Sequence, residues 1–406
     1  MLGEILETFR KGNLPQAELL CRNFLDQAPG NPAALTLLGD IAVRIGAYRA
    51  AQRHYSQALS ASPHLAAAQQ GYAQASTALL KPLPRTSGKR KALLIKAWGY
   101  GFWSDVDHVI GQLLLAEMTG RAPVVYWGKN SLFRSPESGN AFELYFAPAS
   151  DVSSGDLANP GSSFYPPKWS ADNLLEEELN KWSGPYSRVA GIYLLHRTED
   201  TVVSDFYTAV LDLIPWLEPG SEYLETSRSE IYRRLYTKYF RLRPHLQQKV
   251  ETFWQQHMQG RRWLGVHVRG SDKVLEHASL ERVNLEYFVH IDRLLGTDPS
   301  LGLFLLTDSE IFLDQYRQRY GARLLCTPCR RVAGEIGVHY AGFPGVQVAE
   351  EVILDAYLAA RCDSFLGNGT SSVSNWVGYL KAWPQGRFAL FEPDHSSRRN
   401  LMLHHW

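Results

Sequence analysis

Residues 263–273 read WLGVHVRGSDK, and the fold of the C-terminal part of the chain follows from them. The first six, Trp263–Val268, form an apolar run typical of a buried strand. Because side chains alternate along a strand, His267 and Arg269 lie on one face where the strand ends. An arginine there suits a diphosphate, since its planar guanidinium stays charged and binds two oxygens at once. A purely structural Arg–Asp pair is the alternative.

Strand-like and helix-like segments alternate on both sides of this stretch. Apolar runs at Lys91–Ala97, Pro123–Trp127, Leu301–Leu306, Arg323–Cys326, Ser364–Gly367 and Gly386–Phe391 predict further strands, and helical patterns occur at Asp105–Thr119, Glu350–Arg361 and Ser371–Leu380. Residues 150–167 predict a long surface loop, and 172–258 are expected to be largely helical. This rhythm predicts an α/β fold with two Rossmann-like halves of the GT-B type and a ligand between them. The order of the strands stays open.

A glycine-containing loop follows the first predicted strand. Its spacing, GxGxxxD from Gly99, does not meet the dinucleotide fingerprint GxGxxG. Gly99 and Gly101 are therefore expected to let the backbone approach a ligand, and both are candidates for binding the donor. The aromatic side chains around them are expected either to stack on a sugar in the acceptor cleft or to join the core.

The first eighty residues repeat with a period of 34. Gly12 and Gly46, Ala17 and Ala51, Leu25 and Leu59, and Pro29 and Pro63 all keep this spacing. The small residues allow antiparallel helices to approach closely, and the prolines end helices. The segment resembles tetratricopeptide repeats, which bind partner proteins or self-associate.

The amino-acid composition limits the number of domains, the kinds of partner and the cellular location that are expected. The chain has 406 residues, 45% of them hydrophobic and 12% aromatic, which predicts two or three globular domains. A net charge of +1 argues against nucleic acid as a partner. No signal peptide or transmembrane segment is evident, and four cysteines do not form a disulfide scaffold, so a cytoplasmic location is expected. Cys326 and Cys329 form a lone CxxC, for which two free thiols are favoured over zinc or redox chemistry.

The chemistry-bearing motifs resemble those of the α1,6-fucosyltransferases, which include eukaryotic core enzymes and a rhizobial nodulation enzyme. The resemblance rests on GVHVRGSDK at 265–273, LLTD at 305–308, VILD at 352–355, CDSFL at 362–366 and TSS at 370–372. Upstream, the loop at 99–101 and Asp107-His108-Val109 resemble the family's glycine-rich loop. Together these motifs extend over roughly residues 91–395.

The resemblance implies a role for each matching residue. His267 and Asp355 would contact the guanine of GDP-fucose, while Arg269 would bind the diphosphate in place of a metal ion. Ser371 and Ser372 would donate to phosphate at a helix start, and Asp308 would order the donor pocket. Glu276 would be the general base and Lys273 would tune it, with Asp272 as the fallback base. Tyr100, Phe102, Trp103 and His108 are the candidates on the acceptor side, and no metal or other cofactor is expected.

Two departures from the family pattern stand out. Gly270 occupies the place of a second arginine, and Glu276 comes one residue early after Lys273. The predicted domains are repeats at 1–80, a linker at 81–90, an acceptor-side half at 91–258 and a nucleotide-sugar half at 259–406. The expected activity is an inverting, metal-independent transfer of fucose to a glycan, lipid-linked saccharide or protein acceptor. Another nucleotide sugar, or a repeat-bearing scaffold with an inactive transferase domain, are the alternatives.

Overall fold

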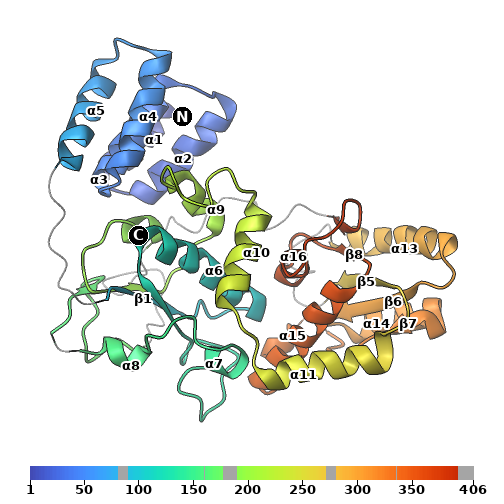
Figure 1. Ribbon diagram of the computed structural model, residues 1–406. Coiled ribbons are helices and arrows are strands. Elements are labelled where there is room, and N and C mark those ends of the chain that lie inside the picture. Colours follow the sequence, from blue (N-terminus) through green and yellow to red (C-terminus); the bar gives the residue numbers. More distant parts are fainter. Residues whose placement is uncertain (81–89, 160, 177–189, 271–279, 335, 392–406) are drawn as a thin grey trace.

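The computed structural model describes residues 1–80, 90–159, 161–176, 190–270, 280–334 and 336–391 (Figure 1). The N-terminal part is all helical, and two α/β parts follow it along the chain. Within the described residues, no helix is long and apolar enough to cross a membrane.

Five helices form the N-terminal part: α1 (Leu2–Arg10), α2 (Leu14–Gln27), α3 (Pro32–Arg44), α4 (Tyr48–Ala61) and α5 (Ala66–Leu79). Helices α2 and α4 begin 34 residues apart, as do α3 and α5. A Cβ added at Gly39 or Gly71 would lie 2.4 or 2.3 Å from the ring of Tyr55, so only glycine lets these helices approach so closely. The helices thus repeat at the expected spacing, and their assignment as tetratricopeptide repeats stays a prediction.

The helical part packs against the first α/β part. The guanidinium of Arg53 donates to the carbonyls of Leu217, at 2.9 Å, and Pro215, at 2.6 Å. Trp216 lies between Pro215 and Leu217 in the sequence. Its indole ring lies edge-on to His54, and the centroid of this ring is 5.4 Å from the guanidinium carbon of Arg22. The short segment around Trp216 therefore fastens the helices to the α/β body.

The first sheet is parallel, with strand order β2-β1-β4-β3. Its strands are β1 (Ala92–Lys96), β2 (Ala122–Tyr126), β3 (Phe164–Tyr165) and β4 (Thr201–Ser204). Around it lie α6 (Phe102–Thr119), α7 (Phe142–Tyr145), α8 (Ser154–Leu157), α9 (Val210–Leu213) and the 3-10 turns η2 (Gly191–Leu194) and η3 (Ile214–Trp216). The expectation of a largely helical 172–258 is wrong at β4, because a four-residue run is too short to show a period of two.

The second sheet is also parallel, with strand order β7-β6-β5-β8-β9. Its strands are β5 (Trp263–Val268), β6 (Gly302–Thr307), β7 (Leu324–Leu325), β8 (Ser364–Gly367) and β9 (Phe388–Leu390). Its helices are α13 (Leu280–Thr297), α14 (Glu310–Tyr320), α15 (Gly345–Arg361) and α16 (Ser372–Tyr379), with short turns η5 (Gly321–Arg323) and η6 (Val338–Tyr340). Three elements precede this sheet: α10 (Arg228–Tyr239), α11 (Pro244–Phe253) and the π-helical turn η4 (Trp254–Met258).

Each sheet has a point where the direction of winding reverses. From β5 the chain runs outward to β6 and β7, then returns to the other side of β5 as β8. In the first sheet, β2 and β4 likewise flank β1. In parallel sheets such a reversal leaves a crevice at the carboxyl ends of the two central strands, where ligands bind. In the described sheets this topology therefore predicts two ligand-binding places, one after β5 and β8, named here the C-terminal crevice, and one after β1 and β4, named the N-terminal crevice.

Aromatic side chains join the two halves. Trp103, on α6, stacks on Trp376, on α16, with ring centroids 5.2 Å apart, and its Nε1 donates to the carbonyl of Val352 at 3.3 Å. Tyr232, on α10, stacks on Tyr379 at 4.2 Å. Helix α10 also packs against α6, so it bridges both halves. The contact is a continuous buried core, and it holds the first turns of α6 and α16 near one another.

Candidate functional site

The C-terminal crevice contains a fixed ion pair. Arg269 follows the last residue of β5, and its Nη1 lies 2.7 Å from Oδ2 of Asp308, which follows β6. The other oxygen of Asp308 accepts from the backbone N–H of Gly270 at 3.1 Å. Both charged side chains are largely buried, with 16% and 11% exposed. The structure thus brings Arg269 and Asp308 together, and the carboxylate fixes the direction of the guanidinium.

His267 lies on the same strand and is almost fully buried. Its Nδ1 is 2.7 Å from Oγ of Ser374, on α16, and that hydroxyl also accepts from the N–H of Asn368 at 3.0 Å. Burial, reinforced by the positive charge of Arg269, lowers the pKa of His267 to about 4. The imidazole is therefore neutral at pH 7 and its ring is held by Ser374, which sequence reasoning did not identify.

The start of α16 lies at the end of β8, beside these residues. Ser371 is the residue before the helix, and its own side chain makes no capping hydrogen bond to the first turn. Asn368 orders the preceding loop, because its Oδ1 accepts from the N–H and the hydroxyl of Thr370 at 2.8 and 2.7 Å. The first N–H groups of a helix attract anions, so Ser371 and Ser372 stand where a phosphate would be bound.

Asp355 is a buried carboxylate on α15, a helix that packs against β5 and β6. The hydroxyl of Thr327 donates to its Oδ1. Burial raises the pKa of Asp355 to about 6, although the hydrogen bond from Thr327 and the positive charge of Arg331 oppose the rise. Neither Thr327 nor Arg331 was singled out from the sequence. The lone CxxC that contains Thr327 was the available indication.

Three predicted catalytic residues lie outside the described residues: Asp272, Lys273 and Glu276. Their roles stay predictions. Gly270, immediately before that segment, is described. A Cβ there would lie 2.4 Å from the ring of Phe312 and 2.9 Å from Cβ of Ser309, so the phenylalanine fills the space that a longer side chain would need. The departure from the family pattern at Gly270 therefore has a packing reason.

The N-terminal crevice is built around the loop after β1. Gly99 has a φ of 86°, which favours glycine, and its N–H donates to Oδ1 of the buried Asp105 at 2.8 Å. The N–H of Tyr100 donates to the same oxygen at 3.2 Å. The loop is thus tied to the first turn of α6, which begins after Gly101. Gly99 is required by this turn, and its amide already has a partner within the protein.

Three of the four acceptor-side candidates belong to the core, which corrects the prediction. Phe102, Trp103 and His108 are 3%, 1% and 0% exposed. Phe102 lies edge-on to rings of its own half, such as Trp127. Trp103 stacks on Trp376 where the two halves meet. Nε2 of His108 lies 3.1 Å from the carbonyl oxygen of Lys96. The reason is that α6 is covered by β1, α10 and α16 together, so its first turns face protein rather than solvent.

Tyr100 remains exposed, at 37%. Its ring centroid lies 5.2 Å from that of Trp98, which in turn contacts Phe206 and Tyr207 at 5.5 and 5.9 Å. The hydroxyl of Tyr207 donates to the carboxylate of Asp107, on α6. Phe206 and Tyr207 follow β4, so sequence reasoning missed them together with that strand.

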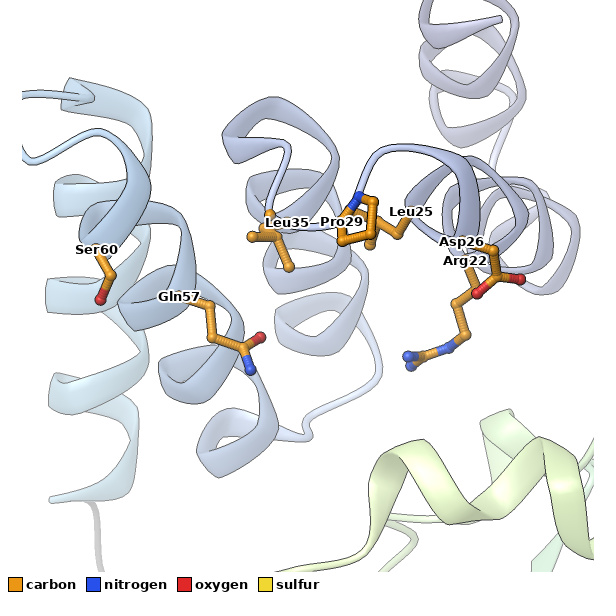
Figure 2. Close-up of a pocket in the computed structure, with 8 residues that line it drawn as sticks. Arg22, Leu25, Asp26, Pro29, Leu35, Gln57 and Ser60 are labelled. Carbon is orange, nitrogen blue, oxygen red and sulfur yellow. The ribbon is translucent and has the colours of Figure 1, made fainter.

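Two open hollows lie elsewhere. One, of about 450 Å³, lies among α2, α3 and α4 (Figure 2). It is lined by Arg22, Leu25, Asp26, Pro29, Gly30, Leu35, Gln57 and Ser60. The other, of about 440 Å³, lies between α4, α5 and Pro219. Neither hollow is lined by residues at the carboxyl ends of β1, β4, β5 or β8.

Two parallel α/β halves, joined by a buried core and with an Arg–Asp pair at the strand ends of the second sheet, define a GT-B-like fold. No family model matches the chain. It is 23% identical over 272 residues to nodulation protein Z of Bradyrhizobium diazoefficiens, covering 62% of this chain and 68% of the relative. It is also 23% identical over 269 residues to nodulation protein Z of Sinorhizobium fredii, and this match covers 62% of this chain and 79% of the relative. The predicted resemblance to the rhizobial nodulation enzyme is thereby confirmed.

Two solved structures align with most of the chain. NodZ alpha-1,6-fucosyltransferase soaked with GDP-fucose aligns with a TM-score of 0.48 at 19% identity, covering 72% of this chain and 93% of that one. POFUT1 in complex with GDP-fucose aligns with a TM-score of 0.46 at 13% identity, covering 76% and 99%.

Proposed function

We propose that the chain is an inverting, metal-independent glycosyltransferase that transfers fucose from GDP-fucose to a hydroxyl of a glycan or glycoconjugate. One observation carries the proposal. Arg269, fixed by Asp308, lies with His267 and the start of α16 at the carboxyl ends of β5 and β8. This is where a parallel sheet binds ligands, and the donors present suit a nucleoside diphosphate. The sequence similarity to nodulation protein Z supports the fucosyl donor.

In the proposed mechanism, the C-terminal crevice holds the nucleotide and its leaving charge. Arg269 and the N–H groups that open α16 at Ser371 and Ser372 bind the diphosphate and stabilise the negative charge that grows on GDP as the glycosidic bond breaks. His267 and Asp355 bind the guanine, because a carboxylate can accept from both its N1–H and its exocyclic amine. The cationic arginine takes the place that a metal ion has in many glycosyltransferases.

The acceptor hydroxyl attacks the anomeric carbon from the face opposite GDP, which inverts the configuration. Glu276, tuned by Lys273, takes the hydroxyl proton, with Asp272 as the fallback base. Tyr100 contributes to the acceptor side, and Gly99 and Gly101 let the loop backbone approach the donor. The N-terminal helices act as tetratricopeptide-like repeats that bind a protein partner or self-associate, and the cytoplasm remains the predicted location.

A second candidate keeps the fold and changes the sugar. Gly270 leaves the crevice without the second arginine of the family pattern, and Phe312 fills the adjacent space. A different sugar on the same GDP carrier is therefore the alternative that this packing favours.

Nucleotide binding tests the proposal. Calorimetric titration with GDP, UDP and dTDP, with and without a chelator, is expected to show a preference for GDP of at least tenfold that the chelator leaves unchanged. GDP-fucose and GDP-mannose are then compared as donors, with released GDP as the readout. Equal affinity for the three nucleotides would overturn the guanine roles of His267 and Asp355. Tight GDP binding with no turnover of either donor would favour an inactive scaffold.

A further inference from the structure

We infer that the segment 326–332 is a positioning device for Asp355, in which Thr327 orients the carboxylate and Arg331 holds the segment in shape. The inference rests on the proposed function, because it assigns to this segment the selection of guanine over other bases. Thr327 and Arg331 are positioning residues: they act on the nucleotide through Asp355.

The path of the segment places it between the diphosphate end of the site and Asp355. It leaves β7, passes Asp355 at Thr327, and returns to the end of β6 at Val332. There the N–H of Val332 donates to the carbonyl of Asp308 at 2.9 Å, and the N–H of Glu310 donates to the carbonyl of Val332 at 3.0 Å. The same Asp308 binds Arg269 through its side chain. The segment is therefore joined at one end to the residue that fixes the diphosphate-binding arginine.

Arg331 closes the segment on itself. Its Nη1 donates to the carbonyl of Cys329 at 2.9 Å and its Nη2 to the carbonyl of Thr327 at 3.0 Å. Two donors on one rigid plane fix two carbonyls relative to each other, whereas the three donors of a lysine ammonium rotate freely and set no such plane. Because both carbonyls belong to the stretch that faces Asp355, the guanidinium determines where the Thr327 hydroxyl points.

The neighbouring Arg330 has a different task. Its guanidinium pairs with the carboxylate of Glu351 and the amide oxygen of Gln347, both on α15. It therefore attaches the segment to the outside of that helix, whereas Arg331 shapes the part that meets Asp355.

The surroundings of Asp355 make its orientation decisive. Asp355 is 7% exposed, and the hydroxyl of Thr327 donates to its Oδ1. Burial raises the pKa of the neighbouring Cys329 thiol well above its usual range, so the thiol adds no negative charge beside the carboxylate. A buried carboxylate with one oxygen held by a hydrogen bond cannot turn freely, and a bidentate contact with a planar base requires such a fixed plane.

Burial and the charges around Asp355 determine the pH range in which its carboxylate is ionised and can bind GDP. Burial raises its pKa to about 6, Thr327, Arg331 and Cys329 lower it, and Glu351 raises it. The carboxylate is needed in its charged form to accept from guanine, so GDP affinity is expected to be full above pH 7 and to fall as the pH drops through about 6. Removing the Thr327 hydroxyl takes away a hydrogen-bond donor to the charged carboxylate. The pH at which GDP affinity is half lost, the pH midpoint, must therefore rise.

The test compares GDP with inosine diphosphate, which lacks only the exocyclic amine. Dissociation constants are measured by calorimetry from pH 5 to pH 8 for wild type, Thr327→Val, Thr327→Ser and Arg331→Gln. In the wild type we expect GDP to bind about tenfold more tightly than inosine diphosphate, since one hydrogen bond to a charged group is lost. Thr327→Val and Arg331→Gln should bring the two affinities together and raise the pH midpoint, while Thr327→Ser should behave as wild type.

Thr297→Val is the matched control, because that hydroxyl donates to the carbonyl of Leu294 in the same half but away from the crevice. If Thr327 had only a structural role, Thr327→Val would weaken the binding of GDP and of inosine diphosphate equally and leave the pH midpoint unchanged. This result would overturn the inference but not the proposed function. A wild type that does not prefer GDP to UDP would overturn the proposed function, and the inference with it.

Discussion

The two strand-end crevices of this molecule share a backbone plan and differ in chemistry. Both form where a parallel sheet reverses its winding, after β5 and β8 in one half and after β1 and β4 in the other. The C-terminal crevice carries a buried Arg–Asp pair and a neutral histidine. The N-terminal crevice carries a chain of aromatic rings that ends in the exposed Tyr100. The fold therefore supplies two equivalent places, and the residues at the strand ends decide what each can bind.

The difference suits a reaction between two unlike substrates. Charged donors at a helix start and a strand end bind a nucleoside diphosphate, whose charge grows during transfer. Aromatic faces bind the apolar faces of sugars with little electrostatic cost. The comparison predicts that substitutions in one crevice affect donor binding and the bond-breaking step, whereas those in the other affect the acceptor.

The largest effect is expected in the charged crevice. Arg269→Ala should lower transfer from GDP-fucose by about a thousandfold, since removing one preorganised donor to a developing negative charge costs a factor of roughly 10² to 10³ and the guanidinium supplies more than one. Transfer is measured by GDP release, and folding by circular dichroism. Arg269→Ala/Asp308→Asn repeats the test without leaving the Asp308 carboxylate buried and unneutralised.

Arg317→Ala is the matched control, because Arg317 is an exposed arginine on α14 of the same half, paired with Asp314 at 3.5 Å. It should transfer fucose as the wild type does. Full transfer by Arg269→Ala would remove the assignment of the charged crevice to the donor.

A smaller effect is expected at the joint that supports both crevices. Trp103→Ala should lower the free energy of unfolding by about 3–5 kcal/mol, because it removes a buried indole between the halves and leaves a cavity. Trp103→Phe keeps a ring and loses the hydrogen bond to Val352, at a cost of about 1 kcal/mol. Denaturant unfolding measures both. An unchanged stability for Trp103→Ala would mean that the joint does not hold the halves together.

The smallest effect is expected in the aromatic crevice. Tyr100→Ala should raise the acceptor KM about fivefold, close to 1 kcal/mol for one aromatic contact, with GDP affinity unchanged. Tyr72→Ala, at a similarly exposed tyrosine on α5, is the control and should leave the acceptor KM as it is. A loss of GDP affinity in Tyr100→Ala would contradict the division of tasks between the crevices.

The elements of this fold differ in how clearly the sequence predicts them. The apolar runs that became β5 and β8 were predicted to within a residue, because each is a continuous buried strand next to a polar motif. Strand β4 was missed, since its four residues carry no period, and Phe206 and Tyr207 were missed with it. Phe102 and Trp103 were assigned to the acceptor cleft, because an aromatic side chain near a glycine loop looks the same in sequence whether it faces solvent or core.

The sequence by itself determined the local features, which depend only on residues that are close together along the chain. An arginine after a buried strand, a serine pair before a helix and small residues at a period of 34 are local facts, and local backbone preferences are enough to interpret them. The tertiary structure alone decided the order of the strands, the partner of Arg269 and the burial of the first turns of α6. It also brought Thr327 to Asp355, 28 residues further along the chain, because only the packing of α15 against the sheet creates that contact.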